Sequence, residues 1–146
     1  MPKQFSQLSF QLNKIVTKQF ATIGNSIPES KEVGIETNVQ FGTNNETKMI
    51  SVFTMFKFES SSEPFIVLET GCYFRLENAS WTNMYMIDTK EIIVPKDFLS
   101  HLVMISIGTA RGILHAKTEG TPFNMFFLPT IDVSKLVTED VKFSFE

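Results

Sequence analysis

The sequence has few of the residues that disulfides and metal sites require. Its 146 residues include one Cys and two His. The lone Cys72 excludes an internal disulfide, which fits a reducing compartment, so we expect a cytoplasmic location. Cys72, His101 and His115 lack metal-ligand spacing, and the two His lie too far apart along one predicted helix to share a site. We therefore expect no metal site, and surface or capping roles for both His.

Catalytic motifs are also missing. The sequence contains no Gly-rich phosphate loop, no nucleophile elbow and no H-E-x-x-H pattern. The acidic pairs Glu29/Glu32 and Glu139/Asp140 lie in predicted loop or surface segments, where solvated charge is the simpler explanation. We therefore predict that the protein is not an enzyme and needs no cofactor.

Strong positive charge and long apolar runs are absent as well. The formal net charge is −3, and the Lys and Arg residues are scattered rather than clustered, which disfavours a nucleic-acid partner. The first residues lack the basic, apolar and small-residue succession of a signal peptide, and no apolar run approaches the ~20 residues of a membrane span. We expect neither nucleic-acid binding nor membrane insertion.

Phenylalanine is the abundant aromatic residue. The chain has 15 Phe and seven Met against one Trp and two Tyr, and 42% of its residues are hydrophobic. Phe carries apolar area without a polar group, and Met adapts to irregular cores and to varied partners. Such a composition fits a Phe-rich core or an apolar binding surface. The length fits a single domain over residues 1–146.

Alternating apolar residues predict strands in the first half of the chain. We expect a half-buried strand over 8–16, a loop over 24–34, a short strand over 34–41, and longer strands over 48–60 and 65–77. Short connections between the two longer strands favour an antiparallel hairpin. Both longer strands are apolar on two faces, so the sheet needs a second cover, either a helix, a subunit or a ligand.

One long helix is predicted in the second half, from Pro95 to about His115, by apolar residues at three-and-four spacing. Its apolar sector is wide, which favours packing against a second helix or subunit. Residues 121–132 contain two prolines and are expected to form a non-regular extended connection. A short helical turn followed by an alternating strand is expected at the C-terminal end.

Four stretches, taken in order, resemble the SecB family of protein-export chaperones. They are FQLNKIVTKQF at 10–20, VLETGCYFRL at 67–76, IVPKDFLSHLVMISIGTARG at 93–112 and LPTID at 128–132. The resemblance implies an α+β fold with a four-stranded antiparallel Greek-key sheet, and with one long helix and a short C-terminal element packed on one face. It also implies a homo-oligomer, a tetramer built as a dimer of dimers, that holds unfolded polypeptides in apolar grooves.

The resemblance suggests which apolar residues bind clients and which form a subunit interface. The two strands that are apolar on both faces and the helix with a wide apolar sector suggest the same. Those expected to face clients are Phe53, Met55, Phe123, Met125, Phe126 and Phe127. Those expected at a subunit interface are Leu102, Val103, Ile105, Ile107, Leu8 and Phe10. Burial explains the same pattern, and the choice between clients and subunits stays open for each residue.

Three functions remain open at this point. The chain is interpreted first as a chaperone for non-native polypeptides, with protein export as one process it could serve. The alternatives are a dedicated partner of one protein, such as an antitoxin, or another non-catalytic interaction module, and a small-molecule pocket protein or enzyme on a similar α+β scaffold. In the family, a longer last helix is followed by a tail that touches the translocation ATPase. No stretch after Asp132 matches them, so a partnership with that ATPase stays open.

Overall fold

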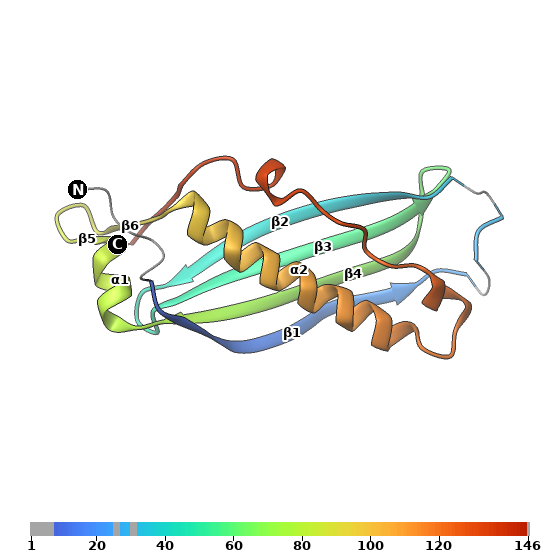
Figure 1. Ribbon diagram of the computed structural model, residues 1–146, viewed down its shortest axis with the longest axis horizontal. Helices are drawn as coiled ribbons and strands as arrows, with labels where there is room; N and C mark the ends of the chain where they lie inside the picture. The colour runs from blue at the N-terminus through green and yellow to red at the C-terminus, as the bar shows by residue number, and fades with distance from the viewer. Residues whose placement is uncertain (1–7, 25–26, 30–31, 146) are drawn as a thin grey trace.

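A four-stranded antiparallel sheet forms the base of the molecule (Figure 1). The computed structural model describes residues 8–24, 27–29 and 32–145. The strands are β1 (Phe10–Thr22), β2 (Gly34–Asn44), β3 (Met49–Ser60) and β4 (Glu63–Leu76), in the order β1-β4-β3-β2. Two hairpins join β2, β3 and β4, and β1 lies beside β4, which is the Greek-key arrangement. This confirms the predicted fold.

The two central strands follow their sequence pattern closely. Val52 lies opposite Cys72 and Phe56 opposite Leu68, and all four side chains are fully buried on one face of the sheet. Alternation predicts this because side chains in a strand point to opposite faces. The strands predicted over 48–60 and 65–77 are confirmed.

The first strand was predicted too short. β1 extends to Thr22 rather than ending at residue 16, and Leu8 precedes it. Its pairing with β4 shifts register between Leu12 and Lys14 and again between Thr17 and Gln19. Each irregularity changes which residues face the core, so simple alternation does not continue through the strand.

The helix α2 (Lys96–Thr118) lies across one face of the sheet (Figure 1). Pro95 precedes its first residue and Asp97 lies in its first turn, where a carboxylate complements the helix dipole. The helix extends slightly beyond the predicted end at residue 115, and Gly120 follows with a φ of +77°. The prediction of a long helix on one face is confirmed.

The wide apolar sector of α2 is covered by the chain itself. The sheet covers one side of the helix, and a C-terminal crossing segment, defined here as residues 126–137, covers another side (Figure 1). Leu128 and Val137 of this segment are 4% and 3% exposed. A second subunit is therefore not needed to explain the apolar width of the helix.

Four of the predicted interface residues lie in the core instead. Leu102 and Val103 have no exposed surface, and Ile107 and Leu8 are 4% and 8% exposed. These side chains cannot contact a second copy without opening the core, so their assignment to a subunit interface is wrong. The other two, Ile105 and Phe10, are partly buried against the core. Packing of segments distant in sequence decides which of these residues are buried within one chain. Helical spacing alone does not show this.

A hydrogen-bonded threonine pair lies beneath α2. Thr54 of β3 and Thr70 of β4 are directly opposite and fully buried, and their hydroxyl oxygens are 2.8 Å apart. Each hydroxyl satisfies the other, which matters because an unpaired buried polar group costs about 1–3 kcal/mol.

We expect Thr54→Val or Thr70→Val alone to lower the free energy of unfolding by about 1–3 kcal/mol, because one buried hydroxyl loses its partner. The double variant should be nearly neutral, since it leaves no unpaired group. Urea unfolding of the four proteins forms a double-mutant cycle that checks this. Additive losses in the double variant would contradict the pairing.

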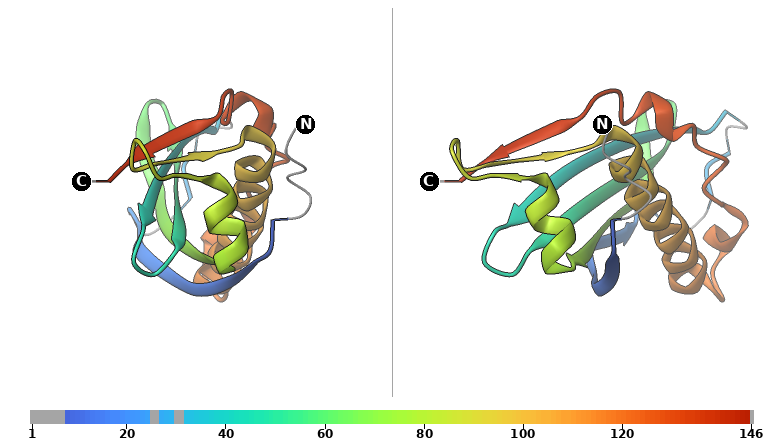
Figure 2. Two further views of the ribbon diagram at one scale, coloured as in Figure 1. Left: turned by 90° about the vertical axis from the view of Figure 1, so that its left-hand side faces the viewer. Right: turned by 60° about the vertical axis from the view of Figure 1, so that its left-hand side comes forward.

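A second, smaller sheet lies at one end of the molecule (Figure 2). It contains β5 (Tyr85–Met86), β6 (Glu91–Val94) and β7 (Val141–Ser144), and the helix α1 (Asn78–Met84) precedes it. The alternating strand predicted at the C-terminal end is confirmed as β7. Its partner β6 and the helix α1 were not predicted, because these elements are too short to show a period.

By length and composition α2 passes as a membrane-spanning helix. In this fold its apolar side chains are largely those that the sheet and the crossing segment cover, including Phe98, Leu99 and Leu102. The core helix of a folded domain has the same composition. The sequence nevertheless has no unbroken apolar run of that length, because polar residues interrupt this helix.

Candidate polypeptide-binding groove

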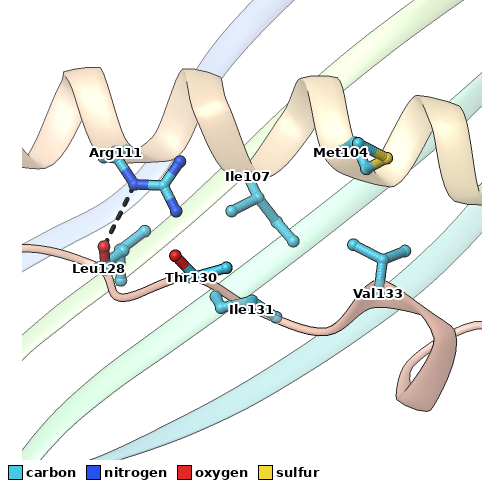
Figure 3. A pocket seen from close by; sticks show the side chains of 7 residues that line it. All are labelled: Met104, Ile107, Arg111, Leu128, Thr130, Ile131 and Val133. Atoms are coloured by element: carbon cyan, nitrogen blue, oxygen red, sulfur yellow. Dashed lines mark hydrogen bonds between the residues drawn. The ribbon is translucent and has the colours of Figure 1, made fainter.

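A groove runs along the seam between α2 and the crossing segment (Figure 3). Its volume is about 290 Å³, and its lining residues are Met104, Ile107, Arg111, Leu128, Thr130, Ile131 and Val133. Figure 3 shows side chains from the helix and from the segment facing each other across it. Small-ligand pockets usually have about 300–1,000 Å³ and are enclosed. This open groove is better suited to individual side chains of an extended chain.

Arg111 fixes one end of the groove. Its Nε donates a hydrogen bond to the carbonyl of Leu128 at 3.2 Å, and a terminal guanidinium nitrogen donates to the carbonyl of Pro129 at 2.9 Å. These carbonyls lie in an irregular segment, where strand or helix partners are missing. One side chain on α2 thus ties the crossing segment to the helix.

Asp132 fixes the other end. Its side chain accepts hydrogen bonds from the Ser134 backbone amide at 3.1 Å and from the Ser134 hydroxyl at 2.6 Å, which begins the 3-10 helix η3 (Val133–Lys135). The Ser134 hydroxyl, followed by its amide, holds the pKa of Asp132 below its ordinary value. The carboxylate therefore stays ionised at neutral pH and keeps the turn beside the groove.

The turn after α2 is built around a second 3-10 helix, η2 (Pro122–Met125). Thr121 caps it by accepting a hydrogen bond from the Phe123 amide, and Asn124 donates to the carbonyl of His115 at 3.0 Å. The prediction of a wholly non-regular connection over 121–132 is therefore wrong for its first part. Capping and side-chain hydrogen bonds form this short helix, and periodicity does not detect them.

The four C-terminal client-facing candidates separate into two groups. Phe123 is 4% exposed and stacks on Phe65 with ring centroids 6.4 Å apart, so it belongs to the core and the client assignment is wrong for it. Phe126 is half-buried against the same ring, at 5.0 Å. Met125 and Phe127 are 62% and 57% exposed, which leaves them free to contact another chain.

Phe127 extends the groove at its Arg111 end. The residue precedes Leu128, and its ring stacks on His115, one helical turn beyond Arg111, with ring centroids 6.1 Å apart. Met104, which is 59% exposed, lies among the lining residues towards the start of the helix. Met104 and Phe127 therefore present exposed apolar side chains towards the two ends of the groove, although Phe127 is not one of the residues that line it.

Phe53 and Met55 lie elsewhere, on the sheet face opposite α2. Phe53 is half-buried, its ring meets that of Tyr73 edge to face at 5.8 Å, and the Lys18 ammonium lies 4.3 Å from its ring centroid. A Cβ on Gly71 would lie 3.1 Å from the Phe53 ring, so glycine allows this close packing. The lysine stem and charge partly cover the apolar ring. The structure thus does not bring Phe53 and Met55 together with Phe127.

Several groove residues were not singled out from the sequence. Met104 and Arg111 on α2, with Ile131 and Val133 on the crossing segment, line the groove but had no assigned role. Met104, Ile107 and Arg111 follow helical three-and-four spacing, so a shared face was detectable. Which segment packs beside that face depends on the path of residues 119–137 and could not be read from the pattern.

The groove offers contact area rather than reactive groups. Arg111 is the charged residue of its lining, and its donors already hold carbonyls of the crossing segment. Within residues 8–24, 27–29 and 32–145, no three His, Cys, Asp or Glu side chains gather to hold a metal ion. Burial raises the pKa of the Cys72 thiol, partly offset by hydrogen bonds with Ser106 and Thr109, so this core thiol is unreactive.

Comparison with known proteins identifies the fold. No protein-family model and no curated protein matches the chain. The structure is similar to that of the SecB-like chaperone Rv1957 of Mycobacterium tuberculosis, solved in complex with a ChAD peptide from the Rv1956 HigA1 antitoxin. The similarity covers 84% of this chain and 91% of that chain, with a TM-score of 0.52 and 10% sequence identity. The chain therefore has a SecB-like fold.

Proposed function

We propose that this protein is a non-catalytic, SecB-like chaperone that binds extended segments of non-native polypeptides in the groove between α2 and the crossing segment. The observation that carries the proposal is the open groove along this seam, with exposed apolar side chains towards both of its ends. Met104 and Phe127 remain more than half exposed there, beside the partly covered Ile131 and Val133. Exposed apolar groups arranged along a groove are typical of protein-binding sites.

Binding at this groove is expected to be weak and tolerant of sequence. Burying one large apolar side chain contributes about 1.5–3 kcal/mol, from which the cost of ordering the client is subtracted. Met104 adapts its shape to different client side chains. A client that folds buries its own apolar residues, so it no longer offers them to the groove and is released.

The test is to replace the exposed apolar residues at the two ends of the groove by Met104→Ser and Phe127→Ser in one variant. We expect its affinity for a denatured model protein, measured by fluorescence anisotropy, to fall about tenfold, because each lost contact removes part of about 1.5–3 kcal/mol. Suppression of aggregation should weaken in parallel.

Ile87→Ser is the matched control, because Ile87 is 78% exposed but follows β5, outside the groove lining. It should leave client binding unchanged. Equal losses in the control and in the groove variant, or no loss in either, would refute this groove as the client site.

A dedicated partnership is the second candidate. The similar SecB-like chaperone was solved with a peptide of an antitoxin, which supports recognition of one segment by this fold. A peptide array separates the two functions, since a general chaperone binds many apolar peptides with similar affinity and a dedicated partner binds one sequence. Assembly as a dimer of dimers, a role in export and a cytoplasmic location remain part of the proposal, and light scattering tests the assembly.

A further inference from the structure

The strand β7 lies at the edge of the small sheet, where it pairs with β6 in the order β5-β6-β7. In register, Val141 is opposite Val94 and Phe143 is opposite Ile92. Figure 2 shows β7 running beside β6 at the end of the molecule. Ile92 and Val94 have no exposed surface. Every second side chain of β7 therefore points into the molecule, as alternation in a strand requires.

Phe145 completes this pattern in an aromatic pocket. Its ring lies 6.3 Å from the centroids of both Trp81 and Tyr85, and its backbone amide donates to the carbonyl of Lys90 at 2.8 Å. Trp81 is held independently, since its indole nitrogen donates to the Asn45 side chain at 2.9 Å. The pocket walls thus come from residues outside β7.

The outer side of β7 has partly solvated polar contacts. Lys142 and Glu91 form an ion pair at 3.3 Å, with the Lys142 side chain 59% exposed, and Ser144 donates to the same carboxylate at 3.3 Å. A hydrogen bond from Thr89, followed by the contact with Lys142, holds the pKa of Glu91 below its ordinary value, so it is charged at neutral pH. The Glu91 side chain is 18% exposed, so the pair is only partly solvated and we expect a modest contribution to stability.

We propose that the edge of β6, with the pocket of Trp81 and Tyr85, is a second polypeptide-binding site, which takes an extended segment with large apolar side chains at alternate positions. In this chain β7 fills the site and is its resident occupant. The ligand pairs its backbone with β6, places aromatic rings at the positions of Phe143 and Phe145, and prefers a basic residue beside Glu91. This is strand addition, in which backbone pairing provides affinity and alternate side chains provide specificity.

Competition with the resident strand sets the affinity for a segment added in trans. A tethered strand has an effective concentration in the millimolar range, so a free segment displaces it only at comparable concentration or when β7 is weakened. The site goes beyond the groove between α2 and the crossing segment, because none of its residues lines that groove.

Trp81 provides the experimental signal, because it is the single Trp of the chain and is 2% exposed beside Phe145. In the full chain, Phe143→Ser with Phe145→Ser should shift Trp81 fluorescence to longer wavelength. A synthetic peptide of residues 138–145 should reverse the shift saturably. The same peptide with Ser at both Phe positions should not. The wild-type chain should need at least about tenfold more peptide for any change.

Lys142→Glu is the second variant, for the case in which the double variant does not fold by circular dichroism. It keeps both Phe residues but places a carboxylate beside Glu91, so it should lower the peptide concentration needed for binding relative to wild type. Phe127→Ser, in the groove, should change neither Trp81 fluorescence nor binding of this peptide, which separates this site from the proposed client groove.

A folded variant whose Trp81 fluorescence does not respond to the peptide would overturn the proposal. So would a wild-type chain that is dimeric by light scattering and becomes monomeric when Phe143 and Phe145 are replaced, because a second copy would then be the occupant. Binding of the peptide to the weakened variants, with no effect of the Ser-containing peptide, supports it.

Discussion

Replacing Leu102 by Ala is expected to lower the free energy of unfolding by about 2–5 kcal/mol, whatever the protein concentration. Leu102 lies on the buried face of α2 and has no exposed surface. The substitution removes buried methyl groups and leaves a cavity in the core. The sheet and the crossing segment are held in place against the helix, so they cannot fill this cavity completely. The loss is a large fraction of the stability of an ordinary domain.

Urea unfolding at several protein concentrations measures this loss. Met104→Ala is the matched control, because Met104 lies on the same helix but is 59% exposed, and surface substitutions usually change stability by less than about 0.5 kcal/mol. If the urea midpoint of Leu102→Ala fell only when the protein was diluted, Leu102 would belong to a subunit interface. That result would contradict its place in the core.

Replacing Arg111 by Ala is expected to have the largest effect on the groove. The substitution removes both hydrogen bonds to the carbonyls of Leu128 and Pro129. Hydrogen bonds from a charged group contribute about 1.5–3 kcal/mol each when buried, and less here because Arg111 is partly exposed. Without them the crossing segment separates from α2, and we expect client affinity to fall by about tenfold or more.

Hydrogen exchange and client binding check this together. Amides of residues 126–133 should exchange faster in Arg111→Ala, while those of β3 should not change. Arg111→Lys keeps the charge but loses the planar pair of donors, so it should restore little of the affinity. Lys117→Ala is the control for loss of one exposed charge from the same helix. Unchanged affinity alongside faster exchange would show that clients do not use this groove.

The two proposed polypeptide sites differ in how they would bind a segment. The groove leaves Met104 and Phe127 outward and binds through side chains, whereas the β6 edge binds through backbone pairing and an aromatic pocket. Phe53, on the sheet face opposite α2, is half-buried and partly covered by Lys18 and Tyr73. Among the described Phe residues only Phe127 is largely exposed, so the abundance of Phe mainly reflects the core.

The sequence by itself determined the elements that have a clear period. Apolar residues of β3 and β4 fall on both faces of the strands, with every second side chain sharing a face, and α2 repeats its apolar residues every three or four positions. Local geometry therefore sets which side chains share a face. The alternating β7 was found for the same reason. The Pro-rich connection and the short segments of α1, β5 and β6 have no such period.

Tertiary structure alone decided which apolar residues remain outside. The sheet and the crossing segment together bury Leu102, Val103 and Ile107, while Met104 on the same helix stays exposed. The turn at η2 places Phe123 in the core and Phe127 at the surface, although both have the same side chain. Periodicity determines which side chains share a face of a helix or strand. Contacts between segments distant in sequence determine whether that face is buried, because burial depends on which residues folding brings next to it.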